Sequence, residues 1–111
     1  MASNKKTIEY LLDQLSSLED VSSRKMFGEY ALYFQGKVVA LVCDDQLYIK
    51  PTKSGKKYIG DTVEAPPYKG AKMYYLISAD LWEDSDWLIE LIKTTASDLP
   101  EPKPKKKKLK I

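Results

Sequence analysis

The sequence contains no histidine and a single cysteine, and these absences exclude several kinds of functional site. Without histidine the chain lacks the usual general base at neutral pH, the usual catalytic triad and the commonest transition-metal ligand. Cys43 alone cannot form an internal disulfide or a cysteine-based zinc site, and this usage fits a reducing compartment. The composition therefore favours a binding protein over an enzyme, and no cofactor is expected.

Long apolar runs are missing as well. No stretch approaches the roughly 20 apolar residues of a membrane helix, and the first six residues lead directly into an amphipathic pattern instead of a signal peptide. We therefore expect a cytoplasmic protein that does not enter the membrane. The length of 111 residues, with 43% hydrophobic and 31% charged residues, suits one globular core.

The net charge of +2 is unevenly distributed. Six of the 18 basic residues and one of the 16 acidic residues lie in residues 100–111, so residues 1–99 carry a net charge of −3. The end of the chain is rich in lysine and proline and has almost nothing to bury. The sequence predicts a folded domain over residues 1–98 and a disordered basic tail over residues 99–111.

Apolar periodicity predicts the first half of the fold. Apolar residues recur at three- and four-residue steps after Asn4, a candidate N-cap, which predicts an amphipathic helix over residues 5–18. Between residues 26 and 49, β-branched and aromatic runs are separated by Gln35-Gly36 and Asp44-Asp45, which suit tight turns. We expect an antiparallel meander of three strands there, with Met26 and Tyr30 on one face of the first strand and Gly28 in a bulge or at a close backbone approach.

The second half alternates helices and strands. Thr52 is placed to cap a short helix that stops at Gly60, and consecutive prolines predict a loop over residues 65–70. A strand over residues 72–78 and a last helix, capped by Asp84 or Ser85, complete the pattern. The expected fold class is α+β: an antiparallel sheet of the meander plus at least one further strand, flanked by helices, in the order helix, three strands, helix, strand, helix.

The segment of residues 24–52 carries a specific resemblance. It contains an Arg-x-Met-Phe-Gly motif, an aromatic strand, a glycine turn, an apolar strand, an aspartate turn and Leu-Tyr-x-Lys, in that order. Together with Pro67-Tyr68, the tyrosine-rich strand and the final tryptophan-containing helix, this pattern resembles the N-terminal domain of the TfoX/Sxy competence regulators over residues 4–97. The resemblance implies a non-enzymatic bacterial domain, in proteins that help the cyclic-AMP receptor protein activate promoters. Those regulators carry a second, helical domain where this sequence has its lysine-rich segment.

Tyrosines and one arginine are the candidate contacts for a protein partner. Tyr33, Tyr48 and Tyr74 lie in predicted strands, and an exposed tyrosine face suits a protein partner or a second copy of the chain. Arg24, the only arginine, suits a bidentate contact to a carboxylate or phosphate, or is a strand-edge charge. Cys43 is interpreted as a small buried hydrophobe, and Asp44-Asp45 as a turn instead of a cation site.

Lysines are the candidate contacts for a polyanion. Clustered lysines neutralise phosphates without exact geometry, and a flexible polycation binds any polyanion by counterion release. The first group lies around the predicted short helix and the proline loop, and the second lies in the tail. They are Lys50, Lys53, Lys56, Lys57, Lys69 and Lys72, then Lys103, Lys105, Lys106, Lys107, Lys108 and Lys110.

Two functions follow from these patterns. The first is a non-catalytic regulatory or adaptor domain that engages a protein partner through its sheet, with an accessory role in transcription as the resemblance implies. The second is a non-specific nucleic-acid-binding module that uses the tail and the lysines of residues 50–72. An enzyme based on lysine or tyrosine chemistry would require a deep pocket around Lys50 or Tyr48.

Overall fold

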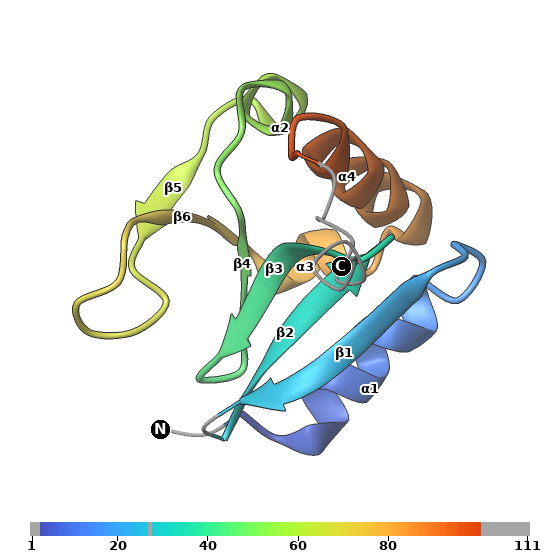
Figure 1. Cartoon of the computed structure of the whole chain (residues 1–111), viewed down its shortest axis with the longest axis vertical. Helices are drawn as coiled ribbons and strands as arrows, with labels where there is room; N and C mark the ends of the chain where they lie inside the picture. The colour runs from blue at the N-terminus through green and yellow to red at the C-terminus, as the bar shows by residue number, and fades with distance from the viewer. Residues whose placement is uncertain (1–2, 27, 101–111) are drawn as a thin grey trace, which may run out of the picture.

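A computed structural model describes residues 3–26 and 28–100. The described residues form one six-stranded antiparallel sheet and four helices, which confirms the α+β class (Figure 1). The elements in chain order are α1 (Lys5–Gln14), β1 (Val21–Met26), β2 (Glu29–Phe34), β3 (Lys37–Cys43), β4 (Gln46–Ile49), α2 (Lys53–Ile59), β5 (Val63–Ala65), β6 (Tyr74–Ile77), α3 (Ala79–Trp82) and α4 (Ser85–Ser97).

The meander has four strands, whereas the sequence predicted three. The sheet order is β1-β2-β3-β4-β6-β5. The residues predicted to form the first strand of the meander belong instead to two strands, β1 and β2, which form a hairpin. Gly28 has a φ of 82°, a left-handed conformation that glycine adopts without strain, and it lies in this hairpin connection. Met26 therefore pairs with Glu29 across the hairpin and does not share a strand with Tyr30, so the predicted bulge at Gly28 is wrong. The alternative, a close backbone approach at Gly28, is found, because the Ser3 N–H donates to the Gly28 carbonyl at 3.1 Å.

Both predicted tight turns are confirmed. Gln35 and Gly36 have φ values of 53° and 79°, and Asp44 and Asp45 have values of 52° and 59°. Two successive positive φ angles are characteristic of a type I′ β-turn, whose twist matches that of the antiparallel strands it joins. These turns set the register at both ends of β3, and the register between β2 and β3 shifts once, at a β-bulge between Leu32 and Tyr33.

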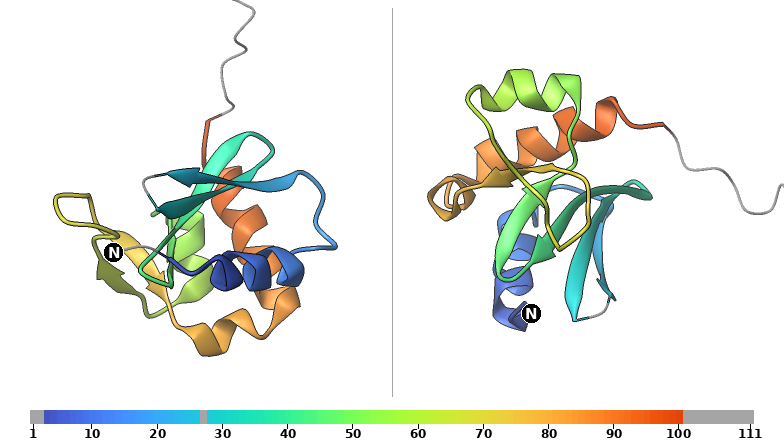
Figure 2. Two further views of the ribbon diagram at one scale, coloured as in Figure 1. Left: turned by 90° about the horizontal axis from the view of Figure 1, so that it is seen from below. Right: turned by 90° about the vertical axis from the view of Figure 1, so that its left-hand side faces the viewer.

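The helices lie on one side of the sheet. In the left view of Figure 2, β1 and β2 lie at the top of the domain and α1 and α3 lie below them, with α4 reaching up toward the strands. The core between them combines α1 and α4 with the inward residues of the central strands. Its fully buried side chains include Leu11, Leu15, Leu32, Leu47, Ile49, Leu88, Leu91 and Ile92.

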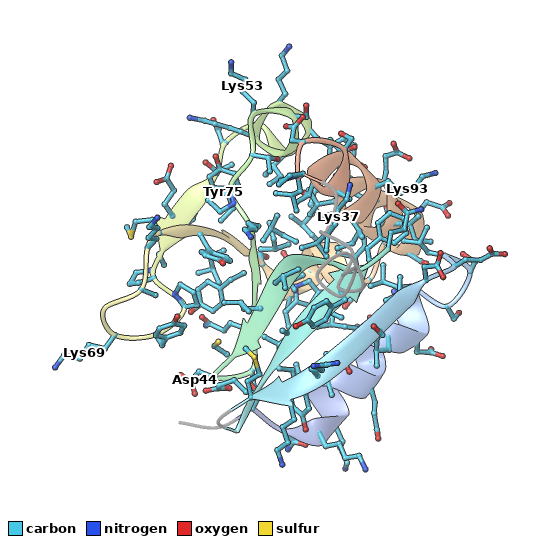
Figure 3. All side chains as sticks on the ribbon, viewed as in Figure 1. Lys37, Asp44, Lys53, Lys69, Tyr75 and Lys93 are labelled. Atoms are coloured by element: carbon cyan, nitrogen blue, oxygen red, sulfur yellow. The ribbon has the colours of Figure 1, made fainter. Side chains whose placement is uncertain are left out.

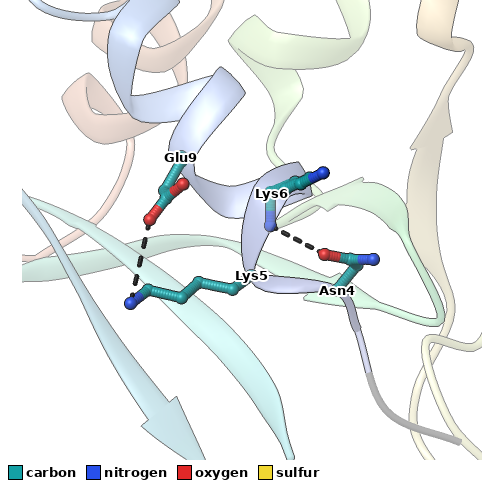
Figure 4. Close-up of polar contacts among 4 residues, drawn as sticks. All are labelled: Asn4, Lys5, Lys6 and Glu9. Atoms are coloured by element: carbon teal, nitrogen blue, oxygen red, sulfur yellow. Dashed lines mark hydrogen bonds and ion pairs between the residues drawn. The ribbon is translucent and has the colours of Figure 1, made fainter.

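Helix α1 begins as predicted but ends earlier. The Asn4 side chain caps it by accepting from the Lys6 backbone N–H at 2.9 Å, and an exposed ion pair of 3.9 Å joins Lys5 to Glu9 (Figure 4). The helix ends at Gln14, although Leu18 still packs against the core. The apolar periodicity of the sequence extends beyond the end of the helix because the turn that follows also packs against the core.

Helix α2 packs on α4 instead of on the sheet. Its predicted cap is confirmed, since Thr52 Oγ1 accepts from the Gly55 N–H at 3.0 Å, and Gly60 follows its last residue. The backbone of Gly55 approaches α4 so closely that a Cβ atom there would lie 3.2 Å from Thr95 Oγ1. Asp98, after α4, accepts from the Ser54 N–H at 2.7 Å and from its hydroxyl at 2.9 Å.

The region around the proline loop contains two elements that the sequence did not indicate. Strand β5 pairs with β6 at the edge of the sheet, and the one-turn helix α3 follows β6 directly. The predicted strand over residues 72–78 is shortened to β6, and Asp84 caps α4 as expected by accepting from the Trp87 N–H at 3.1 Å. Among the described residues, no helix is long and apolar enough to cross a membrane.

Candidate functional site

The outer face of the sheet, opposite the helices, is rich in apolar and aromatic side chains. Register places one row of residues across it, because directly opposed residues point to the same face. In the order of the strands from β1 to β5 the row is Arg24, Ala31, Leu41, Tyr48, Leu76 and Val63. This face is turned toward the viewer in Figure 1, with α1 behind β1 and β2.

A concavity of about 530 Å³ lies on this face, beside the loop that joins β5 to β6. Two exposed side chains line it, Tyr68 from the loop, 59% exposed, and Met26 from the end of β1, 41% exposed. The other lining residues come from β2, β3 and β6. They are Glu29, Tyr30, Leu41, Cys43 and Tyr74. We call this concavity the tyrosine pocket.

The three predicted tyrosines occupy different positions. Tyr74 lines the tyrosine pocket and is partly exposed. Tyr33 is also partly exposed but lies under Arg24, whose guanidinium carbon is 5.9 Å from the ring centroid. Tyr48 is only 7% exposed, and its hydroxyl donates to Gln46 Oε1 at 3.1 Å. The expectation that Tyr48 belongs to an exposed surface is wrong, because its ring is covered by its neighbours on the face.

Negative charge gathers at the inner end of the tyrosine pocket. Burial, together with the charges of Glu29 and Asp44, raises the pKa of the Cys43 thiol to about 11. The same two carboxylates contribute to a raised pKa at Tyr48, after its burial and Cys43. Cys43 is buried and protonated at neutral pH, so it is a poor nucleophile, as the sequence indicated.

A hydrogen-bond network joins this end of the pocket to the N-terminal segment. The Ser3 hydroxyl donates to Glu29 Oε1 at 2.7 Å, and the Asp44 N–H donates to the same oxygen at 3.1 Å. Asp45 Oδ1 accepts from the Asn4 N–H at 2.6 Å and from the Thr7 hydroxyl at 2.8 Å. The β3–β4 turn therefore holds the start of α1 and fixes the position of the Glu29 carboxylate.

The predicted lysine cluster is divided into two places. Lys53, Lys56 and Lys57 surround a second concavity of about 630 Å³ on α2. Lys69 and Lys72 lie in the loop beside the tyrosine pocket, and Figure 3 shows Lys53 and Lys69 at widely separated positions on the molecule. Lys50, directly after β4, is partly buried. The lysines that are near in sequence thus do not form one continuous patch.

The tail lysines Lys103, Lys105, Lys106, Lys107, Lys108 and Lys110 lie outside the described residues. Within residues 3–26 and 28–100, no group of three or more His, Cys, Asp or Glu side chains is arranged to hold a metal ion.

Comparison with known proteins identifies the family. The model of the TfoX N-terminal domain matches residues 13–99, which is most of the chain. This chain belongs to the TfoX N-terminal domain family. A relative from Spirochaeta aurantia, named an uncharacterized 12.7 kDa protein in the trpE 5′ region, is 37% identical over 110 residues, covering 99% of this chain and 95% of the relative.

Sequence reasoning missed the central members of the tyrosine pocket in this TfoX N-terminal domain. Met26, Glu29 and Tyr68 come from a hairpin and a loop that the pattern did not resolve, so nothing in their spacing showed that they meet. The available signal was compositional: Tyr68 follows two prolines in a segment otherwise poor in apolar residues. A large apolar side chain in a proline loop must either pack on the fold or remain exposed, and Tyr68 remains exposed at the rim.

Proposed function

We propose that this TfoX N-terminal domain is a non-catalytic regulatory or adaptor domain that binds a protein partner through the outer face of its sheet. The observation that carries the proposal is the tyrosine pocket, where exposed Met26 and Tyr68 adjoin the partly exposed Tyr74 on a face that no helix covers among the described residues. Exposed apolar side chains grouped around a concavity are typical of interaction sites, and tyrosines are frequent anchors in interfaces.

The energetics of the face agree with a binding role. Burial of apolar surface contributes about 25 cal/mol per Å², and a well-packed aromatic anchor accounts for roughly 2 kcal/mol or more of binding. Tyr68 and Met26 leave a large part of their surface in water in the isolated domain. A partner that covers them gains this energy without any rearrangement of the core.

The chemistry around the pocket supports binding over catalysis. Its one thiol is held protonated, and the hydroxyl of the buried Tyr48 is engaged with Gln46. On the basis of family membership, we propose that the domain acts as an accessory to transcription regulation in the bacterial cytoplasm. The transcription machinery is accordingly the first partner to test.

The test is binding of the full chain to purified bacterial RNA polymerase, measured by biolayer interferometry. Tyr74→Ala and Met26→Ala are expected to weaken binding about tenfold or more, because each removes an apolar contact of the face. Lys93→Ala is the matched control, since Lys93 is exposed on α4, away from the outer face (Figure 3). Binding that is equally strong in all variants would contradict a partner site on this face.

A second function is favoured by the three lysines around the concavity on α2. In this alternative, the domain binds nucleic acid without sequence preference through α2 and the tail. Fluorescence anisotropy with a mixed-sequence DNA duplex across a salt series tests it, because each phosphate contact steepens the salt dependence. Comparison of the full chain, a chain truncated after Leu99 and a Lys53→Gln/Lys56→Gln/Lys57→Gln variant assigns the binding to the tail or to α2.

A second copy of the chain is another proposed occupant of the outer face. Sedimentation velocity over a range of concentrations measures this association directly. If the face forms a homodimer, Met26→Glu should abolish the dimer, since it places a charge in an apolar interface. Lys93→Ala should leave the dimer unchanged.

A further inference from the structure

The tyrosine pocket combines aromatic rings with a carboxylate that has no cationic partner among the described residues. Glu29 lines the pocket together with Tyr30, Tyr68 and Tyr74. Both hydrogen bonds to its side chain, from Ser3 and from the Asp44 backbone, arrive at Oε1. The ion pair found within the described part of the chain joins Lys5 to Glu9 on α1, so it does not involve Glu29.

We propose that the tyrosine pocket receives an arginine side chain from the protein partner, with the guanidinium between the tyrosine rings and the Glu29 carboxylate. This inference rests on the proposed function, because it names the chemistry of the partner that the outer face would bind. The partner segment would present the arginine beside an apolar residue that covers Met26.

The parts of an arginine match the parts of the pocket. A guanidinium is attracted to the face of a tyrosine ring and forms strong hydrogen bonds with a carboxylate. Its aliphatic stem suits contact with apolar side chains such as Met26 and Leu41, which line the same concavity. A lysine ammonium is more strongly hydrated and lacks a planar face, so it is a poorer fit.

Two further observations agree with this assignment. The outer face already holds one such pair, since Arg24 lies over Tyr33 with its guanidinium carbon 5.9 Å from the ring centroid. In addition, Glu29 and Asp44 place two carboxylates near Cys43, where they oppose a negative charge on its thiol. A cation at this end of the pocket would be attracted to both, whereas Lys69 and Lys72 lie in the neighbouring loop.

The test uses three blocked tripeptides, acetyl-Leu-Arg-Leu-amide and its lysine and citrulline counterparts, titrated into the full chain at low ionic strength. Citrulline has the shape of arginine without its charge. Binding is followed by the NMR shifts of the Leu41 and Tyr74 backbone amides. We expect the arginine peptide to bind about tenfold more tightly than the citrulline peptide, with the lysine peptide between them.

Two variants connect this selectivity to the pocket. Glu29→Gln keeps an oxygen that can accept from Ser3 and Asp44 and should reduce the preference for arginine over citrulline to about twofold or less. Tyr74→Leu should weaken the arginine peptide while preserving an apolar wall. Glu64→Gln is the matched control, because Glu64 is an exposed carboxylate on β5 that does not line the pocket and should leave the preference unchanged.

Equal binding of the arginine and citrulline peptides, no binding of either, or a preference that survives Glu29→Gln would overturn the inference. These results are distinguishable from failure of the proposed function. Polymerase binding that requires Tyr74, combined with no arginine preference, rejects the cation pocket alone. Arginine preference without polymerase binding rejects that partner and keeps the pocket.

Discussion

Two neighbouring aspartates in the β3–β4 turn should respond in opposite ways to the same substitution. Asp44 and Asp45 both have positive φ, at 52° and 59°, where a side chain costs energy and glycine does not. Replacing either one with glycine relieves this cost, by roughly 0.5–1 kcal/mol for residues such as aspartate that tolerate the conformation. The two residues differ in the hydrogen bonds that their side chains form.

Asp45 anchors the start of α1, whereas Asp44 contributes through its backbone. The Asp45 carboxylate accepts from the Asn4 N–H and the Thr7 hydroxyl, and these exposed bonds together stabilise the fold by about 1–2 kcal/mol. Asp44→Gly keeps the backbone N–H that donates to Glu29. We expect Asp44→Gly to raise the free energy of unfolding by about 0.5–1 kcal/mol and Asp45→Gly to lower it by about 1 kcal/mol or less.

Urea denaturation followed by tryptophan fluorescence measures both values, since Trp82 and Trp87 lie in the folded core region. Asp20→Gly is the control for strain relief alone, because Asp20 has a φ of 63° and no hydrogen bond from its side chain within the described structure. It should raise stability by the same amount as Asp44→Gly. The reasoning is refuted if Asp45→Gly is as stabilising as the other two variants.

Three other predictions concern the interior. Cys43, with a pKa of about 11 against an ordinary 9.0, should react with iodoacetamide at pH 8 roughly 100-fold more slowly in the native protein than in urea. Gly55→Ala, which helix propensity alone would favour, should lower stability by about 1–3 kcal/mol, because its Cβ would lie 2.7 Å from Thr52 Oγ1; a stabilised variant would contradict this packing. Thr95→Val should raise stability by up to about 1 kcal/mol, since Thr95 Oγ1 is buried without a hydrogen-bond partner among the described residues, and thermal denaturation measures the change.

The sequence predicted the elements whose signals are local. The caps at Asn4, Thr52 and Asp84 depend on side chains that bond to backbone groups only two or three residues away. Asn4 and Thr52 were predicted, and Asp84 was one of the two candidates for the last helix. The two turns with consecutive positive φ angles were recognised for the same reason. Local chemistry of this kind is visible without knowledge of the rest of the fold.

The errors arose where pairing partners decide the structure. Strand β1 has mostly exposed residues, so its apolar pattern was too weak to separate it from β2. Strand β5 has only three residues, and it is a strand because it pairs with β6, which a short sequence segment does not reveal. The burial of Tyr48 depends on neighbours from β3 and β6, which become adjacent only after the sheet has formed. Such contacts leave no periodic signal in a single sequence.

The order of the strands has a consequence for the way this protein reaches its native state. Each strand of the β1–β4 meander pairs with its neighbour across a short turn, and such closures cost little chain entropy. Pairing of β4 with β6 must instead enclose residues 50–73, so it is expected to form later than the meander. Tyr74 and the loop that carries Tyr68 are therefore expected to reach the outer face after the meander has formed.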